Sequence, residues 1–131
     1  MSVRGRGNAE EILAVTDDLT RSDKWYRYFQ GFSSPYNFYG PEEYRTWLSE
    51  AGLEARQVGL IPKDMVHPGR EGLIGFLFAT WLPYTDRLPP NLRSEFIGEV
   101  AGSYLELHPL DSNGRSHVKM VRLQVEAGRP G

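Results

Sequence analysis

The sequence has no cysteine, no long apolar run and no marked excess of either charge. Without cysteine, the chain cannot form a disulfide framework or a thiolate zinc site, and it cannot use a cysteine nucleophile. The formal net charge is only −2 over 131 residues, so nothing electrostatic points to nucleic acid or an anionic membrane. The most apolar stretch, Leu73 to Leu82, is about half as long as a bilayer span, and we expect a buried helix there. These absences fit a cytoplasmic protein without a membrane partner.

Length and composition predict a single globular domain over residues 1–131. Apolar residues make up 40% and charged residues 24% of the chain, which is the usual balance for a soluble domain with one hydrophobic core. Aromatic residues are frequent, with three Trp, seven Tyr and six Phe. Most of them lie between Trp25 and Trp81, so this region is expected to dominate the packing.

Capping residues and apolar periodicity predict five helical segments. The first is expected to begin at Asn8, a good N-cap with Glu11 at capping-box spacing. The clearest helix begins at Pro41 and ends at Gly52, because proline favours the first helical position and glycine the position after the last. The remaining segments are Asp23–Gln30, Arg70–Leu82 and the stretch from Pro90 towards His108. Because residues 70–82 are apolar nearly all round, we expect other elements to enclose that helix.

Two strands and one aromatic loop complete the predicted pattern. The strands are residues 54–61, ending at Pro62, and residues 116–127, and the loop is Gly31 to Gly40. The last strand has Val121, Leu123 and Val125 on one face and other apolar residues on the opposite face, which favours a place inside a larger sheet. The chain is therefore expected to be a helix-dominated α+β fold.

Two segments resemble a known family. They are Y-x-x-W-L-x-x-A-G-L, residues 44–53, and H-V-K-M-V-R-L, residues 117–123. Together with the aromatic loop and the residues around them, they resemble the C-terminal half of class I S-adenosylmethionine-dependent methyltransferases similar to trans-aconitate methyltransferase. The resemblance covers nearly the whole chain. In that family the sheet has seven strands, and the last is antiparallel and inserted between the fifth and sixth.

The resemblance implies which parts of the methyltransferase fold are here. Residues 4–8 would be the end of strand five, residues 54–61 strand six and residues 116–127 strand seven. The family's glycine-rich turn and the acidic residues that hold the cofactor would lie upstream of Met1. We therefore expect no cofactor to be bound by this chain alone, although the complete enzyme implies S-adenosylmethionine. Alone the chain is expected to be inactive. Three explanations stay open: it pairs with a separate cofactor-binding domain, it forms a homodimer through an open sheet edge, or it is a truncated gene product.

The resemblance to trans-aconitate methyltransferase also implies a small, carboxylate-bearing acceptor. In that family the region between strands six and seven forms part of a cap over the acceptor. Arginine pairs bidentately with carboxylates, which makes Arg70 the best single candidate for holding the acceptor. The full set of candidates is His67, Arg70 and Arg87 as polar contacts, with Tyr36, Tyr39, Trp81 and Tyr84 as walls. The ordinary alternative is core packing for the aromatic residues and a solvated helix end for the two arginines.

No catalytic or metal-binding residue is predicted from the sequence. The three histidines show no ligand spacing. Ser116 and His117 lack an elbow motif, and the pair Asp17–Asp18 is expected on a solvated helix face. Two other functions stay open: a small-molecule binding module without chemistry, and a protein-interaction module whose aromatic residues are simply core.

Overall fold

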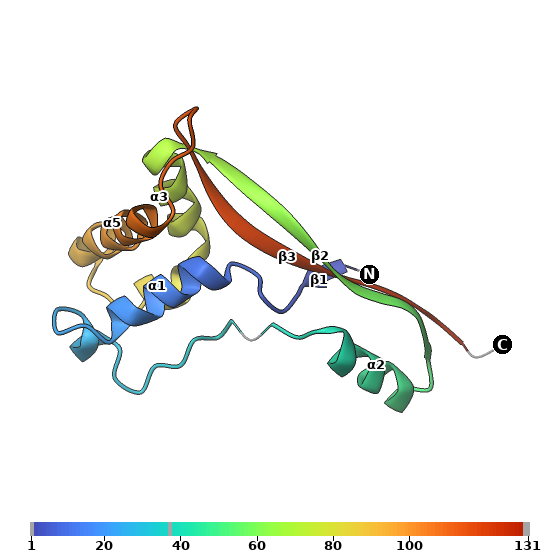
Figure 1. Cartoon of the computed structure of the whole chain (residues 1–131). Helices are drawn as coiled ribbons and strands as arrows, with labels where there is room; N and C mark the ends of the chain where they lie inside the picture. Colours follow the sequence, from blue (N-terminus) through green and yellow to red (C-terminus); the bar gives the residue numbers. More distant parts are fainter. Residues whose placement is uncertain (1, 37, 130–131) are drawn as a thin grey trace. The chain divides into compact units, whose positions relative to one another are not determined.

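The computed structural model describes residues 2–36 and 38–129 (Figure 1). The predicted α+β class is confirmed, with five α-helices and one three-stranded sheet in this part of the chain. By its contacts the chain divides into two compact units. Unit 1 consists of residues 2–10, 36, 38–64 and 119–129, and unit 2 consists of Glu11–Pro35 and Met65–Val118.

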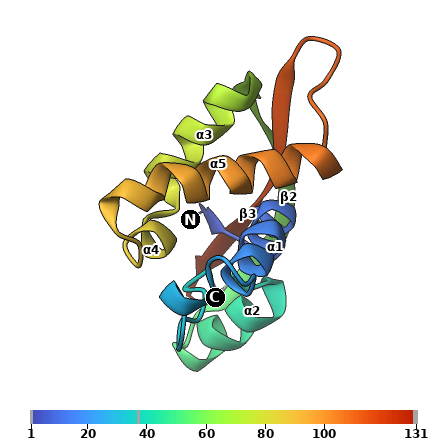
Figure 2. The same cartoon turned by 90° about the vertical axis from the view of Figure 1, so that its left-hand side faces the viewer.

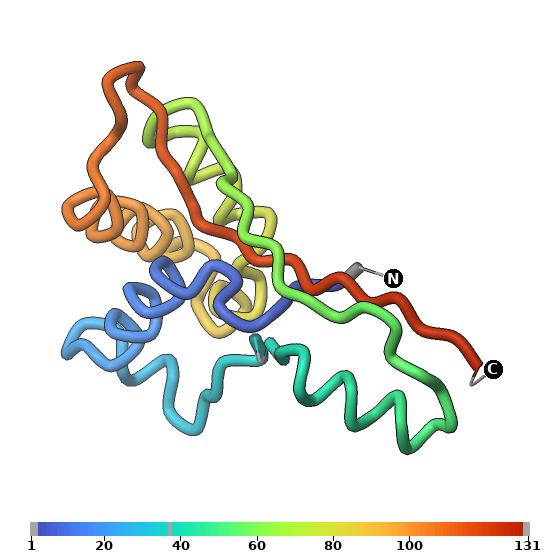
Figure 3. The backbone as a smooth tube through the Cα atoms, turned by 45° about the vertical axis from the view of Figure 1, so that its right-hand side comes forward, coloured from blue at the N-terminus to red at the C-terminus, as the bar shows by residue number. Residues whose placement is uncertain are grey.

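The sheet has the strand order β1-β3-β2, formed by Ser2–Arg4, Arg115–Gly128 and Glu54–Pro68 respectively. Strand β1 is antiparallel to β3, with Val3 opposite Leu123. Figure 3 shows β2 and β3 side by side and running in opposite directions. The last strand therefore lies in the middle and antiparallel to both neighbours, which is the arrangement that the resemblance implies.

The ends of two predicted strands need correction. The first strand is Ser2–Arg4 and not residues 4–8; of these only Arg4 belongs to the strand, and the turn begins at Arg6. Strand β2 does not end at Pro62 but continues to Pro68. Proline is tolerated at this point because β2 is an edge strand, so its missing N–H removes no bond from the middle of the ladder.

The first helix, α1 (Glu10–Thr20), begins two residues later than predicted because Asn8 has another role. The Oδ1 of Asn8 accepts the backbone N–H of Val121 at 2.8 Å. The N–H of Ala9 donates to the carbonyl of Lys119 at 3.0 Å, and Ala9 has a φ of 52°. Asn8 and Ala9 thus supply hydrogen bonds to β3 and do not start the helix.

The aromatic segment after α1 is mostly irregular. Only Tyr26–Tyr28 forms a short 3-10 helix, so the predicted helix over residues 23–30 is wrong. Trp25 and Phe29 on either side are buried, and the Trp25 ring meets Phe96 edge-on at 5.2 Å, so packing holds this segment in place of a helical ladder. Residues 31–40 form the predicted loop apart from Asn37, which lies outside the described residues.

Helix α2 (Pro41–Glu50) agrees closely with the sequence prediction. Pro41 is in its first turn, and the backbone N–H of Gly40 donates to the Glu43 carboxylate at 2.9 Å. One side of α2 belongs to the core of unit 1. There Tyr44 and Leu48 pack against the buried residues Val58, Leu123 and Val125.

The helices of unit 2 are α3 (Gly69–Thr80), α4 (Leu82–Thr85) and α5 (Pro90–Leu107), and α3 packs beside α5 (Figure 2). The predicted helix over residues 70–82 is thus interrupted at Trp81, one residue before α4 begins with Pro83 in its first turn. Its expected enclosure is also wrong, because only Leu73 and Leu77 of α3 are buried while Phe78 is 40% exposed. Helix α5 runs as predicted, with Phe96, Val100 and Tyr104 buried at steps of four. No helix in residues 2–36 and 38–129 is long and apolar enough to cross a membrane.

The apolar residues on both faces of β3 are buried in different parts of the strand. In unit 2 the even-numbered Ser116 and Val118 are buried, and in unit 1 the odd-numbered Val121, Leu123 and Val125 are buried. Since successive strand residues point to opposite faces, each half of β3 buries one face. This pattern explains why the sequence of β3 has apolar residues on both faces. It does not require a sheet that is covered on both sides along its whole length.

The role of Asn8 leads to a stability prediction. Replacing Asn8 by alanine leaves the Val121 N–H without its acceptor, and such a loss costs about 1–3 kcal/mol of unfolding free energy. Asn8→Asp keeps an acceptor oxygen and should be less destabilising. Urea denaturation measures the free energy, and hydrogen exchange should show faster exchange of the Val121 amide in Asn8→Ala only. Asn91→Ala, at an exposed position of α5, is the control. Unchanged exchange at Val121 would contradict this account and favour the helix-cap interpretation.

Candidate functional site

Trp81 and Tyr84, two of the predicted site residues, lie inside unit 2. Their side chains are 3% and 0% exposed. The indole N–H of Trp81 donates to the Thr16 hydroxyl at 2.8 Å, and the Tyr84 hydroxyl donates to the Asp17 carboxylate at 2.8 Å. Both polar groups are thereby satisfied by α1 (Glu10–Thr20). Asp17 is accordingly a hydrogen-bond acceptor at the edge of the core and not simply part of a solvated face.

A continuous set of ring contacts connects His67, Trp81, Tyr84 and Arg87. We call the rings of His67, Phe76, Trp81, Tyr84 and Phe32 the ring cluster. Neighbouring centroids along this series lie 4.8, 5.8, 6.2 and 5.0 Å apart. The structure therefore brings four of the seven predicted residues together around one aromatic core.

Arg87 lies at the rim of the ring cluster. Its guanidinium carbon is 5.2 Å from the centre of the Phe32 ring, and its Nη2 donates to the carbonyl of Gln30 at 3.3 Å. This is a long hydrogen bond at an exposed position, so most of the guanidinium donors stay available. Arg87 is the member of the predicted set best placed to meet an anion from solvent.

Arg70 is not in the ring cluster but connects α3 to α5. Its Nη2 donates to the Gly98 carbonyl at 3.0 Å. A Cβ on Gly98 would lie 3.6 Å from that nitrogen and a Cβ on Gly102 3.9 Å, so the guanidinium lies beside both glycines at ordinary contact distance. Arg70 therefore links helices α3 and α5 by a hydrogen bond, a role that the sequence analysis did not predict.

His67 carries the one buried side-chain polar atom without a hydrogen-bond partner in the described part of the chain, its Nε2. The ring lies against Phe76, and burial lowers the pKa of the imidazole. A neutral imidazole is therefore favoured in the folded state. The Nε2 atom, the natural donor or acceptor for a ligand, is closed off from solvent.

Tyr36 and Tyr39 belong to unit 1. The Tyr36 ring stacks on Phe38 at 6.1 Å, and burial raises the pKa of its hydroxyl while the nearby positive charge of Arg4 opposes that rise. The Tyr39 ring meets Trp47 edge-on at 5.0 Å. The backbone carbonyl of Tyr39 accepts a hydrogen bond from the backbone N–H of Arg6. Both tyrosines pack against other rings, and each unit thus contains its own part of the predicted set.

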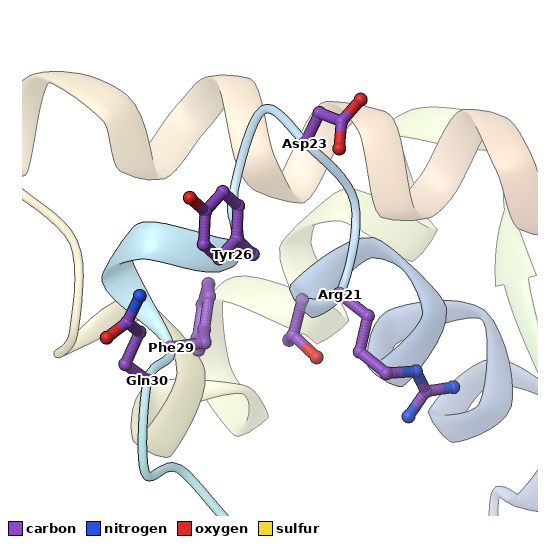
Figure 4. A pocket seen from close by; sticks show the side chains of 6 residues that line it. Arg21, Asp23, Tyr26, Phe29 and Gln30 are labelled. Atoms are coloured by element: carbon purple, nitrogen blue, oxygen red, sulfur yellow. The ribbon is translucent and has the colours of Figure 1, made fainter.

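A pocket of about 540 Å³ opens on unit 2 and contains none of the predicted residues (Figure 4). Tyr26 and Phe29 lie close together on one side of it. Arg21 points away from them and is paired with Asp18 at 2.6 Å. The lining residues are Thr20, Arg21, Asp23, Tyr26, Phe29 and Gln30. No set of polar groups converges on this pocket, so it has no evident chemistry.

A second pocket, of about 270 Å³, lies on unit 1 and was missed by the sequence analysis. We call it the basic pocket, and its lining residues are Val3, Arg4, Asn8, Lys63, Met120, Val121 and Arg122. The cations come from three strands that are far apart in sequence, so only the strand register brings them together. In residues 2–36 and 38–129 no group of three His, Cys, Asp or Glu side chains is placed to hold a metal ion.

Comparison with known proteins gives one partial similarity. No protein-family model matches the chain. Over 92 residues, or 70% of this chain, the sequence is 24% identical to a protein of Invertebrate iridescent virus 6 named "Putative methyltransferase 235L". The aligned part is 34% of that protein, so the chain spans about a third of the length of the relative that it matches. The comparison supports a methyltransferase-like relationship and does not distinguish trans-aconitate methyltransferase within it.

The environment of His67 leads to a prediction about pH. The pKa of this imidazole is lower in the folded state than its ordinary value of 6.5, so the unfolded chain binds more protons below that pH. Stability should fall as the pH drops below about 6.5. His67→Phe removes both this dependence and an unsatisfied nitrogen, so it should be as stable as the parent at pH 7 and more stable at pH 5.

Urea denaturation at the two pH values measures the effect. His108→Gln is the control, because His108 is paired with Glu11 at the surface and is not closed off. Equal loss of stability at pH 5 in the parent and in His67→Phe would rule out a buried neutral His67.

Proposed function

We propose that this chain provides the acceptor-cap and terminal-strand part of an S-adenosylmethionine-dependent methyltransferase that acts on a small carboxylate-bearing molecule. The observation that carries the proposal is the strand order β1-β3-β2, with β3 antiparallel in the middle. This order corresponds to strands five, seven and six of the class I methyltransferases that the sequence resembles. The partial similarity to a viral protein named as a methyltransferase supports the same assignment.

The turn that follows β1 does not fit a cofactor. It contains Gly5 and Gly7, but a Cβ on Gly5 would lie 2.6 Å from the Leu60 side chain, so this glycine serves close strand packing. The N–H groups of Gly5, Asn8 and Ala9 all donate to backbone carbonyls. The turn therefore has few donors left for a ligand. We propose that S-adenosylmethionine is held by a separate cofactor-binding domain or by a second subunit.

The ring cluster is suited to positioning an acceptor. Methyl transfer from a sulfonium needs alignment and exclusion of water more than acid–base groups, because the cofactor carries the reactive methyl. Trp81 and Tyr84 are buried and fixed by hydrogen bonds to α1, so they give the half-exposed rim at Phe32 and Arg87 a rigid base. Arg87 at the rim supplies guanidinium donors for a carboxylate, and Arg70 contributes indirectly by holding α3 against α5.

An open sheet edge supports the proposal of a partner. Strand β2 is at the edge of the sheet, and four of its apolar residues are exposed: Leu60, Ile61, Met65 and Val66. An edge of this kind is a ready template for another chain. The same observation favours the second candidate function, a protein-interaction module without chemistry. Size-exclusion chromatography with light scattering tests self-association, and a monomer at all concentrations would exclude the homodimer.

Calorimetric titration with S-adenosylmethionine tests whether this chain holds the cofactor. We expect no binding at millimolar ligand, because the Gly5–Asn8 turn is already satisfied by the chain itself. Micromolar binding would mean that the chain completes a cofactor site, and the proposed division of the enzyme would be wrong.

Binding of a tricarboxylate tests the proposed acceptor site. Propane-1,2,3-tricarboxylate should shift the amide NMR signals around Phe32 and Arg87, and Arg87→Gln should weaken binding by about tenfold through loss of a charge-assisted hydrogen bond. Arg27→Gln is a matched control, because Arg27 is an exposed arginine that also stacks on a ring, that of Tyr28 at 4.8 Å. Equal weakening by the two variants would leave only a general charge effect and would contradict a site at Arg87.

A further inference from the structure

The basic pocket of unit 1 brings three cations together from three strands. Arg4 lies on β1, Arg122 on β3 and Lys63 on β2, and all three line the same pocket of about 270 Å³. Arg4 and Arg122 are directly opposite each other in the antiparallel pair. Like charges at directly opposite positions destabilise a sheet, so this pair is unfavourable without an anion between or above the two side chains.

The three cations are gathered at one pocket, and none of them has the kind of carboxylate partner that Arg6 of the same unit has. Arg6 is paired with Glu42 at 2.8 Å. Within the described part of the chain, Arg4, Lys63 and Arg122 have no ion pair with a carboxylate, and no acidic residue lines their pocket. No carboxylate among the described residues therefore compensates the positive charge of these three side chains.

The remaining lining residues add an apolar surface and a fixed amide. Met120 is half-buried and lies on the same face of β3 as Arg122, whereas Val3 and Val121 direct their side chains to the opposite face and line the pocket from behind. Asn8 is 3% exposed, and its Oδ1 is committed to the Val121 N–H. This bond fixes the orientation of the amide and leaves the Nδ2 donors for a ligand. The pocket thus combines charge, an orientated donor and an apolar surface.

We propose that the basic pocket binds a phosphate monoester carried on a short aliphatic chain. A phosphate monoester has close to two negative charges at neutral pH and three terminal oxygens, which suits two guanidinium groups and one ammonium group from three directions. A carboxylate has one charge and two oxygens and would leave one cation uncompensated. The aliphatic chain would lie on Met120, which is on the same face of β3 as Arg122. This inference does not rest on the proposed methyltransferase function.

Titration of the isotopically labelled chain with propyl phosphate, followed by amide NMR at low ionic strength, tests the proposal. Low salt is needed because exposed charges are screened. We expect saturable shifts at Val3, Met120 and Val121. Arg122→Gln and Lys63→Gln should each weaken binding by about tenfold, since each removes a charge-assisted hydrogen bond. Arg56→Gln is the matched control, an exposed arginine on β2 that does not line the pocket.

Each alternative outcome has a definite meaning. Pentanoate carries an alkyl chain of similar size on a carboxylate, and binding as tight as that of propyl phosphate would overturn the preference for phosphate. Equal weakening by Arg56→Gln and Arg122→Gln would reduce the effect to general charge and overturn the site. Absence of saturable shifts in the parent chain would do the same. Shifts around Phe32 and Arg87 in place of Val3 and Val121 would assign the anion to the ring-cluster rim and reject the basic pocket.

Discussion

The central strand β3 needs hydrogen-bond partners on both sides, and much of unit 1 is arranged to supply them. The turn after β1 continues the pairing where the strand itself has ended. Gly5 donates to the Val121 carbonyl, Asn8 accepts the Val121 N–H, and Ala9 donates to the Lys119 carbonyl. Buried backbone groups must be paired, so this requirement determines the path of the chain before α1 can begin.

Elements with local sequence signals were predictable, whereas elements defined by pairing with β3 were not. Helices α2 and α5 carry local signals, namely Pro41 in the first turn and buried residues at steps of four in α5. The helix start at Asn8 was predicted wrongly because the residue that binds its side chain is 113 positions away. A three-residue strand such as β1 has no periodicity to detect, and only its pairing with β3 defines it.

The candidate site was predictable in residue type but not in role. The sequence identified an aromatic-rich region with arginines, and the structure gathers His67, Trp81, Tyr84 and Arg87 around one set of rings. It could not distinguish Arg87 at the rim from Arg70 bound to the Gly98 carbonyl, because both look alike as helix-end charges. The basic pocket was missed for the same reason, since the opposition of Arg4 and Arg122 exists only in the register.

The basic pocket differs from the paired basic residues because three cations share one pocket whose lining contains no carboxylate. Arg6, Arg21 and Lys24 each have carboxylate partners in this structure. Such surface pairs contribute little individually, but they compensate charge locally. Arg4, Lys63 and Arg122 surround a pocket without any acidic residue. A neutral residue in place of Arg4 or Arg122 would relieve the repulsion and leave the packing of Val3 and Leu123 unchanged, because these two side chains point to the other face of the sheet. A function in binding an anion explains why the three cations occur together where packing does not require them.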